Sequence, residues 1–209
     1  ERTTIMILEN KLGIREEKEL EIKEEQISKI KALELFDKSL LDGFPVSEFK
    51  GLAMIHKHLY EDIYDFAGHI RHVNIIKGSF PFALGSYLPE ILKNISQMPQ
   101  STFDEIIEKY IEMNIAHPFR DGNGRSMRIW LDCIMKKEVK SVVEWSKISK
   151  EEYMNAMAKS PVSDNDIKTL ICNALTHKTA DRQVYIEGID ASYAYEGYSN
   201  FKLKDMARS

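Results

Sequence analysis

Helix-breaking residues are scarce in this chain. The 209 residues include 10 glycines and 6 prolines, a low share that favours long helices over many short strands and turns. Between Arg15 and Lys38 apolar residues recur three or four positions apart, or at multiples of this spacing, as on one helix face (Leu20, Ile27, Ile30, Leu33 and Phe36). We expect the glutamates and lysines between them to form the solvent-facing side of this helix.

Start and stop signals place further helices along the chain. One is expected from Leu52 to Phe66, with Gly68 as its C-terminal cap. Capping-box patterns at Thr102–Glu105 and Ser149–Glu152 each begin another helix. Three more helices are expected over residues 126–137, 164–175 and 189–197.

The stretch from Val73 to Tyr87 differs from the rest. It places β-branched and aromatic residues on both sides of Gly78, which fits a short hairpin. Pro81 lies in the second half and would confine that half to a sheet edge. We find no other convincing strand pattern, so the sequence predicts an all-α domain that carries one β-hairpin.

Composition excludes several classes of protein. The net charge is −4, which disfavours a non-specific nucleic-acid binder or a basic membrane-surface protein. No apolar run approaches the roughly 18 residues of a transmembrane helix. Cys133 and Cys172 stand alone in apolar stretches, where we expect buried small side chains and no disulfide framework. The sequence starts without a secretion signal, so we expect a cytoplasmic protein.

The string from His117 to Arg128 holds the chemistry of the chain. It reads His-Pro-Phe-Arg-Asp-Gly-Asn-Gly-Arg-Ser-Met-Arg and lies between two helical stretches. Gly122 and Gly124 directly precede a helix, where backbone N–H groups can approach an anion closely. Arg125 and Arg128 are three residues apart and share one face of the first helical turns. An amide nest beside two guanidinium groups suits a polyphosphate.

Two further residues of this string complete a reaction site. Asp121 at the loop edge could hold Mg²⁺, which binds to one or two carboxylates together with substrate phosphates. His117 has the unperturbed pKa of a general base. Other known patterns fail on spacing: a P-loop needs GxxxxGK[ST], an EF-hand needs an oxygen ligand where Arg125 stands, and no HExxH sequence occurs. A capped surface loop without function is the remaining alternative.

His117 to Arg128 matches every fixed position of the Fic motif, HxFx[DE]GNGRxxR, so the chain resembles the Fic family, named for cell filamentation. The resemblance extends over roughly Leu52 to Leu175. It includes residues 63–71, which look like the helix leading into the family's flap, and residues 77–83, which look like the flap hairpin. Fic proteins transfer AMP from ATP to a protein hydroxyl.

The resemblance implies a role for each motif residue. His117 would take the proton from the target hydroxyl, Phe119 would fix the loop in the core, and Asp121 would bind Mg²⁺. Gly122, Asn123 and Gly124 would form the anion hole, while Arg125 would hold the phosphates and Arg128 the γ-phosphate. A phosphorylating relative has Lys in place of Gly124, so glycine fits AMP transfer. The flap would comprise Lys77, Gly78, Phe80 and Phe82.

Phe80 and Phe82 could either grip an incoming target segment or pack in the core. A gripped segment would add to the hairpin edge as an extra strand.

A second motif lies near the end of the sequence. Ser192 to Gly197 resembles the family's inhibitory signature [ST]xxxE[GN]. Ser192 and Glu196 are four residues apart and face the same side of a helix, and Gly197 is a natural cap. The resemblance implies that Glu196 pairs with Arg128 and takes the place of the γ-phosphate. An ordinary amphipathic end helix is the alternative. A released tail would also bring Tyr193 and Tyr195 near the site, where self-modification is a further hypothesis.

The resemblance therefore implies a Mg²⁺-dependent protein adenylyltransferase that uses ATP and is inhibited by its own C-terminal helix. The target would be a protein, and the ATPase subunits of type II topoisomerases are one expectation. We expect no direct nucleic-acid or membrane partner and leave self-association open. Transfer of another nucleotide or phosphate-linked group, and a non-enzymatic nucleotide sensor, are the alternatives.

Three parts of the chain are expected. Residues 1–50 would form a helical arm packed on the core. Residues 51–188 would form the catalytic core, with the flap at about 73–87 and the motif at 117–128. Residues 189–209 would form the inhibitory helix and tail.

Overall fold

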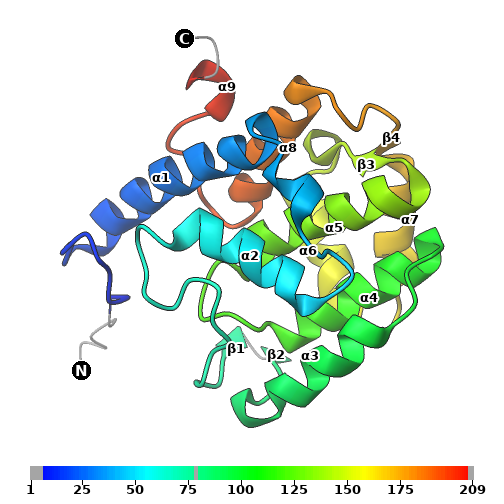
Figure 1. The fold of residues 1–209 in the computed structure, drawn as a ribbon, viewed down its shortest axis with the longest axis horizontal. Helices are drawn as coiled ribbons and strands as arrows, with labels where there is room; N and C mark the ends of the chain where they lie inside the picture. Colours follow the sequence, from blue (N-terminus) through cyan, green and yellow to red (C-terminus); the bar gives the residue numbers. More distant parts are fainter. Residues whose placement is uncertain (1–6, 78–79, 207–209) are drawn as a thin grey trace.

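The chain folds into a bundle of helices with two small pairs of strands (Figure 1). The computed structural model describes residues 7–77 and 80–206. The α-helices in these residues are α1 (Glu17–Asp37), α2 (Phe49–Tyr60), α3 (Leu88–Gln97), α4 (Phe103–Ala116), α5 (Asn123–Val139), α6 (Lys150–Lys159), α7 (Asn165–Asn173), α8 (Arg182–Tyr195) and α9 (Leu203–Met206). Short 3₁₀ turns, η1 (Leu40–Gly43), η2 (Gly85–Tyr87) and η3 (Trp145–Lys147), join some of them. The all-α expectation is confirmed.

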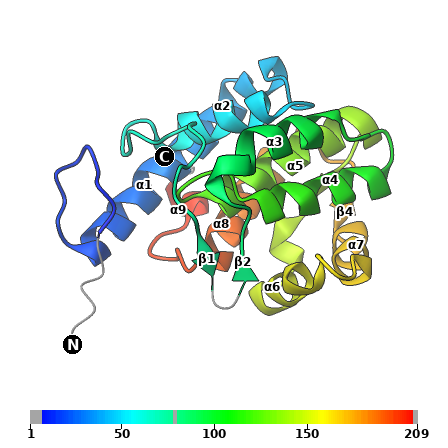
Figure 2. The same ribbon diagram turned by 90° about the horizontal axis from the view of Figure 1, so that it is seen from below.

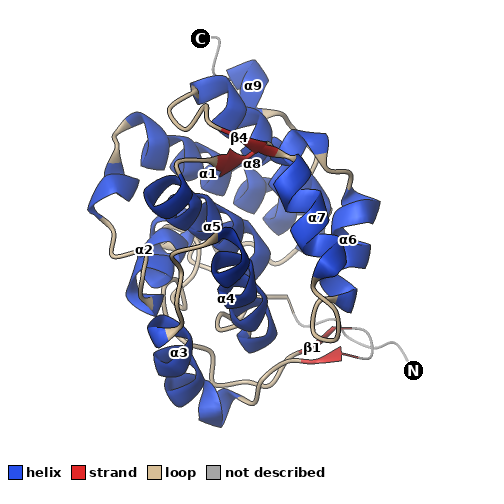
Figure 3. Ribbon diagram, turned by 90° about the vertical axis from the view of Figure 1, so that its right-hand side faces the viewer, coloured by secondary structure: helices blue, strands red, loops and turns tan. Residues whose placement is uncertain are grey.

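The expected hairpin is present, and it projects at the lower edge of Figure 2. Strands β1 (Ile76–Lys77) and β2 (Phe80–Pro81) pair antiparallel, with Lys77 opposite Phe80. A second antiparallel pair, β3 (Val142–Val143) and β4 (Leu175–Thr176), was not predicted (Figure 3). Two-residue strands are too short to show an alternating pattern, so the sequence carried no sign of this pair.

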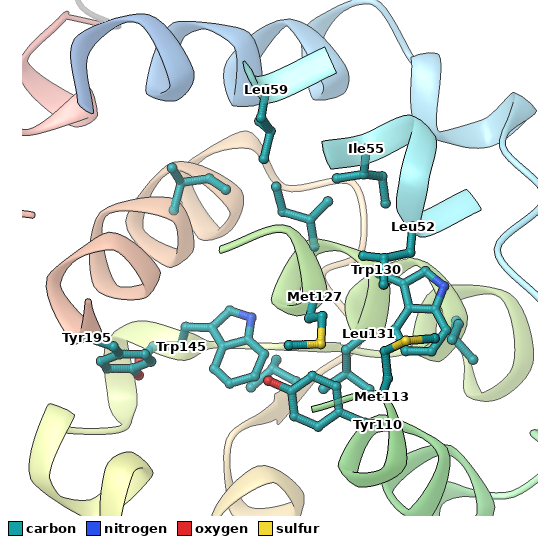
Figure 4. Close-up of a cluster of buried hydrophobic side chains, with 14 of the residues drawn as sticks. Leu52, Ile55, Leu59, Tyr110, Met113, Met127, Trp130, Leu131, Trp145 and Tyr195 are labelled. Atoms are coloured by element: carbon teal, nitrogen blue, oxygen red, sulfur yellow. The ribbon is translucent and has the colours of Figure 1, made fainter. Parts of the chain in front are cut away.

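Helix α5 runs through the middle of the bundle, with α2, α4 and α8 packed around it (Figure 1). Figure 4 shows this core, to which α2 contributes Leu52, Ile55 and Leu59, α5 contributes Met127, Trp130 and Leu131, and α4 contributes Tyr110 and Met113. All of these side chains are fully buried. The start of α5, which carries the predicted motif, is therefore held on a rigid scaffold.

Several predicted helix boundaries need correction. Helix α2 ends at Tyr60 rather than Phe66, because the chain turns before the left-handed Gly68. Helix α5 begins at Asn123, three residues before the predicted Ser126, and α8 begins at Arg182, seven residues before Ile189. Helix α3 was not predicted. Both capping boxes are confirmed, since Thr102 and Ser149 each exchange hydrogen bonds with the glutamate three residues later.

The charged side of α1 does not face solvent throughout, contrary to expectation. Glu24, Glu25 and Lys29 are each at most 2% exposed, whereas Ile30, expected on the apolar face, is 42% exposed. Buried charges are stable only when they are paired. Glu25 pairs with Lys29 at 3.0 Å, and Lys29 also reaches Asp190 on α8 at 3.0 Å. Helix α1 is thus bound to the C-terminal part of the chain through buried ion pairs.

Cys133 is half-buried, as its apolar surroundings suggested, but Cys172 is exposed, so the expectation that both are buried was wrong for Cys172. Neither forms a disulfide in the structure. None of the helices within residues 7–77 and 80–206 combines the length and the hydrophobicity that crossing a bilayer requires.

Candidate active site

The predicted motif forms the turn between α4 and α5. His117 caps α4 in a left-handed conformation with φ 48°, and Gly122 precedes α5 with φ 75°. The Asn123 side chain closes the loop, because it accepts a hydrogen bond from the Phe119 backbone N–H at 2.8 Å and donates one to the Phe119 carbonyl at 2.7 Å. Phe119 itself is fully buried. The first N–H groups of an α-helix have no partner within the helix, so the start of α5 can offer N–H groups to an anion.

A buried histidine supports this loop from α2. The His56 ring stacks on Phe119 with their centroids 3.8 Å apart. Its Nδ1 accepts a hydrogen bond from the Gly68 N–H, so Nε2 carries the proton that is donated to the Asp121 carbonyl at 2.8 Å. Burial lowers the pKa of His56 to about 3, which keeps this neutral form. The role of His56 could not be predicted from the sequence, since the loop it contacts lies 65 residues away.

His117 lies between the motif and the flap hairpin. Its ring stacks on Phe82, with the centroids 3.8 Å apart and the planes 15° apart. Burial and the nearby positive charge of Lys77 lower the pKa of His117 to about 4. The imidazole is therefore neutral at pH 7, as a proton acceptor must be. Phe82 is buried in this packing, whereas Phe80 is half-buried. The two phenyl rings meet edge to face, with their centroids 5.1 Å apart.

Arg71 fixes the flap to the same turn. This side chain is 3% exposed and donates hydrogen bonds to the carbonyls of His117 at 2.7 Å, Val73 at 2.6 Å and Ala116 at 3.1 Å, as well as to the Ala83 carbonyl. One guanidinium group thus joins the end of α4 to both sides of the hairpin. Its role was not predicted, because an arginine with only backbone partners has no sequence signature.

The inhibitory signature meets the motif at Arg128. Arg128 Nε donates to the Ser192 hydroxyl at 2.7 Å, and Nη2 donates to the Ser192 carbonyl at 2.8 Å and to Glu196 Oε1 at 3.0 Å. Nη1 lies 3.3 Å from the Tyr153 hydroxyl. Arg128 is 1% exposed. The structure therefore brings Ser192, Glu196 and Arg128 together, as the resemblance to the inhibitory signature implied.

The Glu196 carboxylate occupies the mouth of the motif loop. It lies so close to Gly124 that a Cβ at position 124 would overlap Oε1. Its other oxygen is 3.6 Å from Lys77 Nζ on the flap. Burial opposes ionisation of Glu196, but the charges of Arg128 and Lys77 outweigh this effect and lower its pKa to about 2. An anionic group is thus held against the loop at neutral pH.

Arg125, which was predicted to hold the phosphates, forms buried contacts on the inner side of the loop. It is 2% exposed, its guanidinium pairs with Glu24 of α1, and Nη2 also lies near Asp121 of the loop. Three aromatic rings, those of Tyr60, Tyr193 and Tyr198, enclose it at centroid distances of 5.3, 5.4 and 4.2 Å. The partner Glu24 was missed, because 101 residues separate the two.

Asp121 is the acidic residue of the loop that remains accessible. Its side chain is 39% exposed, and Oδ2 lies 3.4 Å from Arg125 Nη2. Within the described part of the chain, no three His, Cys, Asp or Glu residues cluster as a metal site. A single accessible carboxylate nevertheless fits Mg²⁺ that arrives with phosphates, because this ion keeps most of its ligands from water and substrate.

The remaining predicted residues have the following places. Tyr193 and Tyr195 are 0% and 3% exposed, so neither hydroxyl is accessible while α8 is docked. The Tyr195 hydroxyl bonds the carbonyls of Trp145 and Ile148, each at 2.7 Å. Gly197 follows α8 with φ 90°, as expected of a cap. Gly78, predicted at the flap tip, lies outside the described residues.

Comparisons with known proteins agree with this geometry. Residues 47–135 match the sequence model of the Fic/DOC family. The protein adenylyltransferase VbhT of Bartonella schoenbuchensis is 31% identical over 199 residues, which are 88% of this chain. This chain covers 40% of the length of VbhT. The Escherichia coli protein named “Probable protein adenylyltransferase Fic” is 28% identical over 169 residues, which cover 76% of this chain and 82% of that protein.

Solved structures share the fold. The Fic domain of a Bartonella quintana effector with bound ADP has a TM-score of 0.68 and 21% identity, and the alignment covers 84% of this chain and 93% of that one. BepC from Bartonella tribocorum with bound AMPPNP has a TM-score of 0.67 and 19% identity, over 83% and 94% of the two chains. The loop geometry, the family match over residues 47–135 and the shared fold agree, and the chain therefore carries a Fic domain.

Proposed function

We propose that this chain is a protein adenylyltransferase that transfers AMP from ATP to a hydroxyl group of a target protein. The observation that supports this most is a neutral, stacked His117 at the edge of a loop whose N–H groups and Arg128 can bind phosphates. Relatives named protein adenylyltransferases and nucleotide-bound structures of the same fold support the same proposal.

In the proposed reaction the target hydroxyl oxygen bonds to the α-phosphorus of ATP while the bond to the bridging oxygen breaks. Pyrophosphate leaves, and His117 takes the proton of the hydroxyl. The loop N–H groups and Arg128 hold the phosphates in line, so that positioning and charge stabilisation supply most of the rate. Asp121 would hold Mg²⁺, which neutralises charge on the leaving pyrophosphate. Arg125, which is buried, paired with Glu24 and 3.4 Å from Asp121 Oδ2, would support the loop and hold the phosphates from its inner side.

We further propose that α8 inhibits the enzyme. Glu196 pairs with Arg128 and lies against Gly124, so it would take the place of the γ-phosphate. Because α8 is one continuous helix from Arg182 to Tyr195, we place the start of the inhibitory segment at Arg182 and leave residues 51–181 as the proposed catalytic core. The helical arm before it supports both parts through α1. Subunits of type II topoisomerases stay a proposed target class.

The test uses the Glu196→Gly variant with a bacterial lysate and labelled ATP. Label at the α-phosphate should enter protein and label at the γ-phosphate should not. Transfer of the γ-label would mean phosphorylation, and transfer from other labelled nucleotides with equal efficiency would mean a different nucleotide donor. If nucleotide binds without any transfer, the chain is a nucleotide sensor and the proposal is wrong.

A further inference from the structure

A cavity of about 380 Å³ lies behind the inhibitory helix, away from the motif loop. Its walls come from residues 128–137 of α5, from α8, from η1 and from the segment around Trp145. The volume is within the range of small-molecule sites, about 300–1,000 Å³. Arg128 and Ser192 also line the cavity, and they hydrogen-bond to each other beside the contact of Arg128 with Glu196. None of its lining residues belongs to the flap or to the loop of residues 117–124.

The floor of this cavity is apolar. Val143, Trp145 and Ile189 line it and are each at most 4% exposed. Asp132 also lines it, but its two oxygens are already satisfied by the Val143 N–H at 2.8 Å and the Trp145 indole N–H at 2.9 Å. The floor is therefore mostly apolar and its carboxylate is hydrogen-bonded, which suits a hydrocarbon body.

A glycine in α8 keeps the floor open. Gly188 lies in the middle of this helix, where glycine is a poor helix former. A Cβ at this position would meet Trp145 Cδ1 at 3.4 Å, an ordinary contact, so alanine would fit without a clash. What glycine provides here is space in the cavity rather than a required backbone conformation.

The rim carries more positive than negative charge. Its exposed charged residues are three lysines and two aspartates (Lys136, Lys137, Lys178, Asp42 and Asp181). Lys136 pairs with Asp42 at 3.3 Å. Lys178 has no carboxylate within ion-pair distance in the described part of the chain. An apolar floor beneath an unpaired ammonium group is complementary to an amphipathic anion.

We propose that this cavity binds an amphipathic monocarboxylate such as a medium-chain fatty acid, with its alkyl chain on Trp145 and Ile189 and its carboxylate at Lys178. Helix α8 supplies one whole wall of the site, so the ligand binds only while α8 is docked. A ligand that binds one state alone shifts the equilibrium toward it, and at ten times its Kd the ratio of docked to released helix rises about elevenfold. The ligand should therefore strengthen inhibition, a consequence that rests on the proposed function.

Decanoate is the probe, and decanol is the uncharged control of equal chain length, both below their aggregation limits. Binding is followed by calorimetry and by tryptophan fluorescence, because Trp145 lines the cavity while Trp130 is buried elsewhere. We expect saturable binding of decanoate at one site, severalfold tighter than decanol. No saturable binding, or equal affinity for the two probes, would overturn the proposal.

Variants locate the site. Gly188→Leu should fill the cavity and weaken decanoate at least tenfold, and the milder Gly188→Ala covers the case in which leucine prevents folding. Lys178→Glu should weaken decanoate severalfold and leave decanol unchanged, whereas Lys93→Glu, on exposed α3 surface, should change neither. Unchanged binding in both the Gly188 and the Lys178 variants would place the ligand elsewhere and refute the assignment.

The binding experiments need no enzymatic activity, so they separate this proposal from the proposed function. If decanoate binds but no variant of the chain ever transfers AMP, the proposed function fails and the site stands. If transfer occurs and decanoate does not bind, the site fails alone.

Discussion

The carboxylate of Glu196 fills the space above Gly124, which only a residue without a side chain leaves free. The same carboxylate pairs with Arg128 at 3.0 Å. One carboxylate therefore blocks the space at Gly124 and also engages the guanidinium group of Arg128. Around this contact Tyr195 stacks on Tyr153, with the ring centroids 4.7 Å apart, and packs against Trp145. The ion pair therefore acts together with docking of the aromatic side of α8.

Glu196→Gly should activate the protein. Surface ion pairs contribute only about 0–1 kcal/mol, but this pair lies against a buried Arg128 and works with the docked helix. A docked state favoured 99 to 1 requires about 2.7 kcal/mol. We expect ATP-dependent labelling to rise about tenfold or more, measured as a time course beside wild type.

The matched controls for this prediction lie on the same helix. Glu196→Gln keeps the shape of the side chain and removes its charge, so it should activate in the same direction. Glu187→Gln changes an exposed glutamate of α8 and should leave labelling at the wild-type level. Equal labelling of wild type and Glu196→Gly would refute inhibition through this residue.

His117→Ala, introduced into the Glu196→Gly variant, should abolish transfer and leave binding of Mg·ATP nearly intact. The phosphates are held by other groups, whereas the proton of the target hydroxyl has no other acceptor in the proposed reaction. Loss of a general base lowers the rate roughly 10²–10⁴-fold. Labelling and nucleotide affinity are measured on the same preparation. Labelling at the rate of Glu196→Gly alone would remove His117 from the role of base.

Asp121→Ala in the activated background should cripple Mg²⁺-dependent transfer. Asp121 is the accessible carboxylate of the loop, and it is the residue proposed to hold the ion beside the phosphates. The rate is measured while Mg²⁺ is titrated, and a chelator provides the control. Full activity in excess chelator, or an unchanged Mg²⁺ dependence in the variant, would show that Asp121 has no part in the site.

The pH profile of the activated variant should lack a transition near 6.5. Burial and Lys77 lower the pKa of His117 to about 4, and Glu196, which raises it, is absent from this variant. Transfer should therefore stay constant between about pH 8 and 6 and fall only as the pH approaches 4 and the imidazole takes up a proton. Circular dichroism at each pH separates this loss from unfolding. A midpoint near 6.5 would contradict the assigned environment of His117.

Inhibition of the wild-type protein should not be relieved by mild acid. The pKa of Glu196 is lowered to about 2, below its ordinary value of 4.5. Because the pKa of Glu196 is lowered while α8 is docked, its carboxylate stabilises the docked helix fully at any pH above the ordinary pKa. This stabilisation is lost only as the pH falls toward 2. Wild-type labelling should remain low from pH 8 to 5. Activation within that range would mean that another group controls α8.

Glu24→Ala should destabilise the fold by about 3–5 kcal/mol, because it leaves the Arg125 guanidinium buried without its partner. Both side chains are 2% exposed, and the Tyr64 hydroxyl would lose its acceptor as well. The control is Glu21→Ala, an exposed glutamate of the same helix, for which a change within about 0.5 kcal/mol is expected. Urea unfolding measures both. Equal stabilities of the two variants would show that the Glu24–Arg125 pair contributes no net stability.

Local features of the site could be predicted from the sequence because neighbours along the chain create them. Two glycines before a helix, a histidine at the end of the preceding one, and a serine four residues before a glutamate are contiguous patterns with known geometry. The capping boxes at Thr102 and Ser149 were predictable for the same reason. Helix boundaries were less accurate: α8 begins seven residues before its predicted start at Ile189, and the prediction overlooked Asp181, whose side chain caps the helix by accepting from the Gln183 and Val184 N–H groups.

The tertiary structure alone decided which charges are buried and what they contact. Glu24 and Arg125 are 101 residues apart, and the sequence offers no reason to choose this glutamate over its neighbours on α1. The same holds for His56 under the motif loop and for the cavity between α5 and α8. Helical spacing and turn chemistry act within a few residues, so a sequence determines them directly. A buried charge or a cavity depends on groups that several distant segments bring to one point, and it exists only once those segments have packed together.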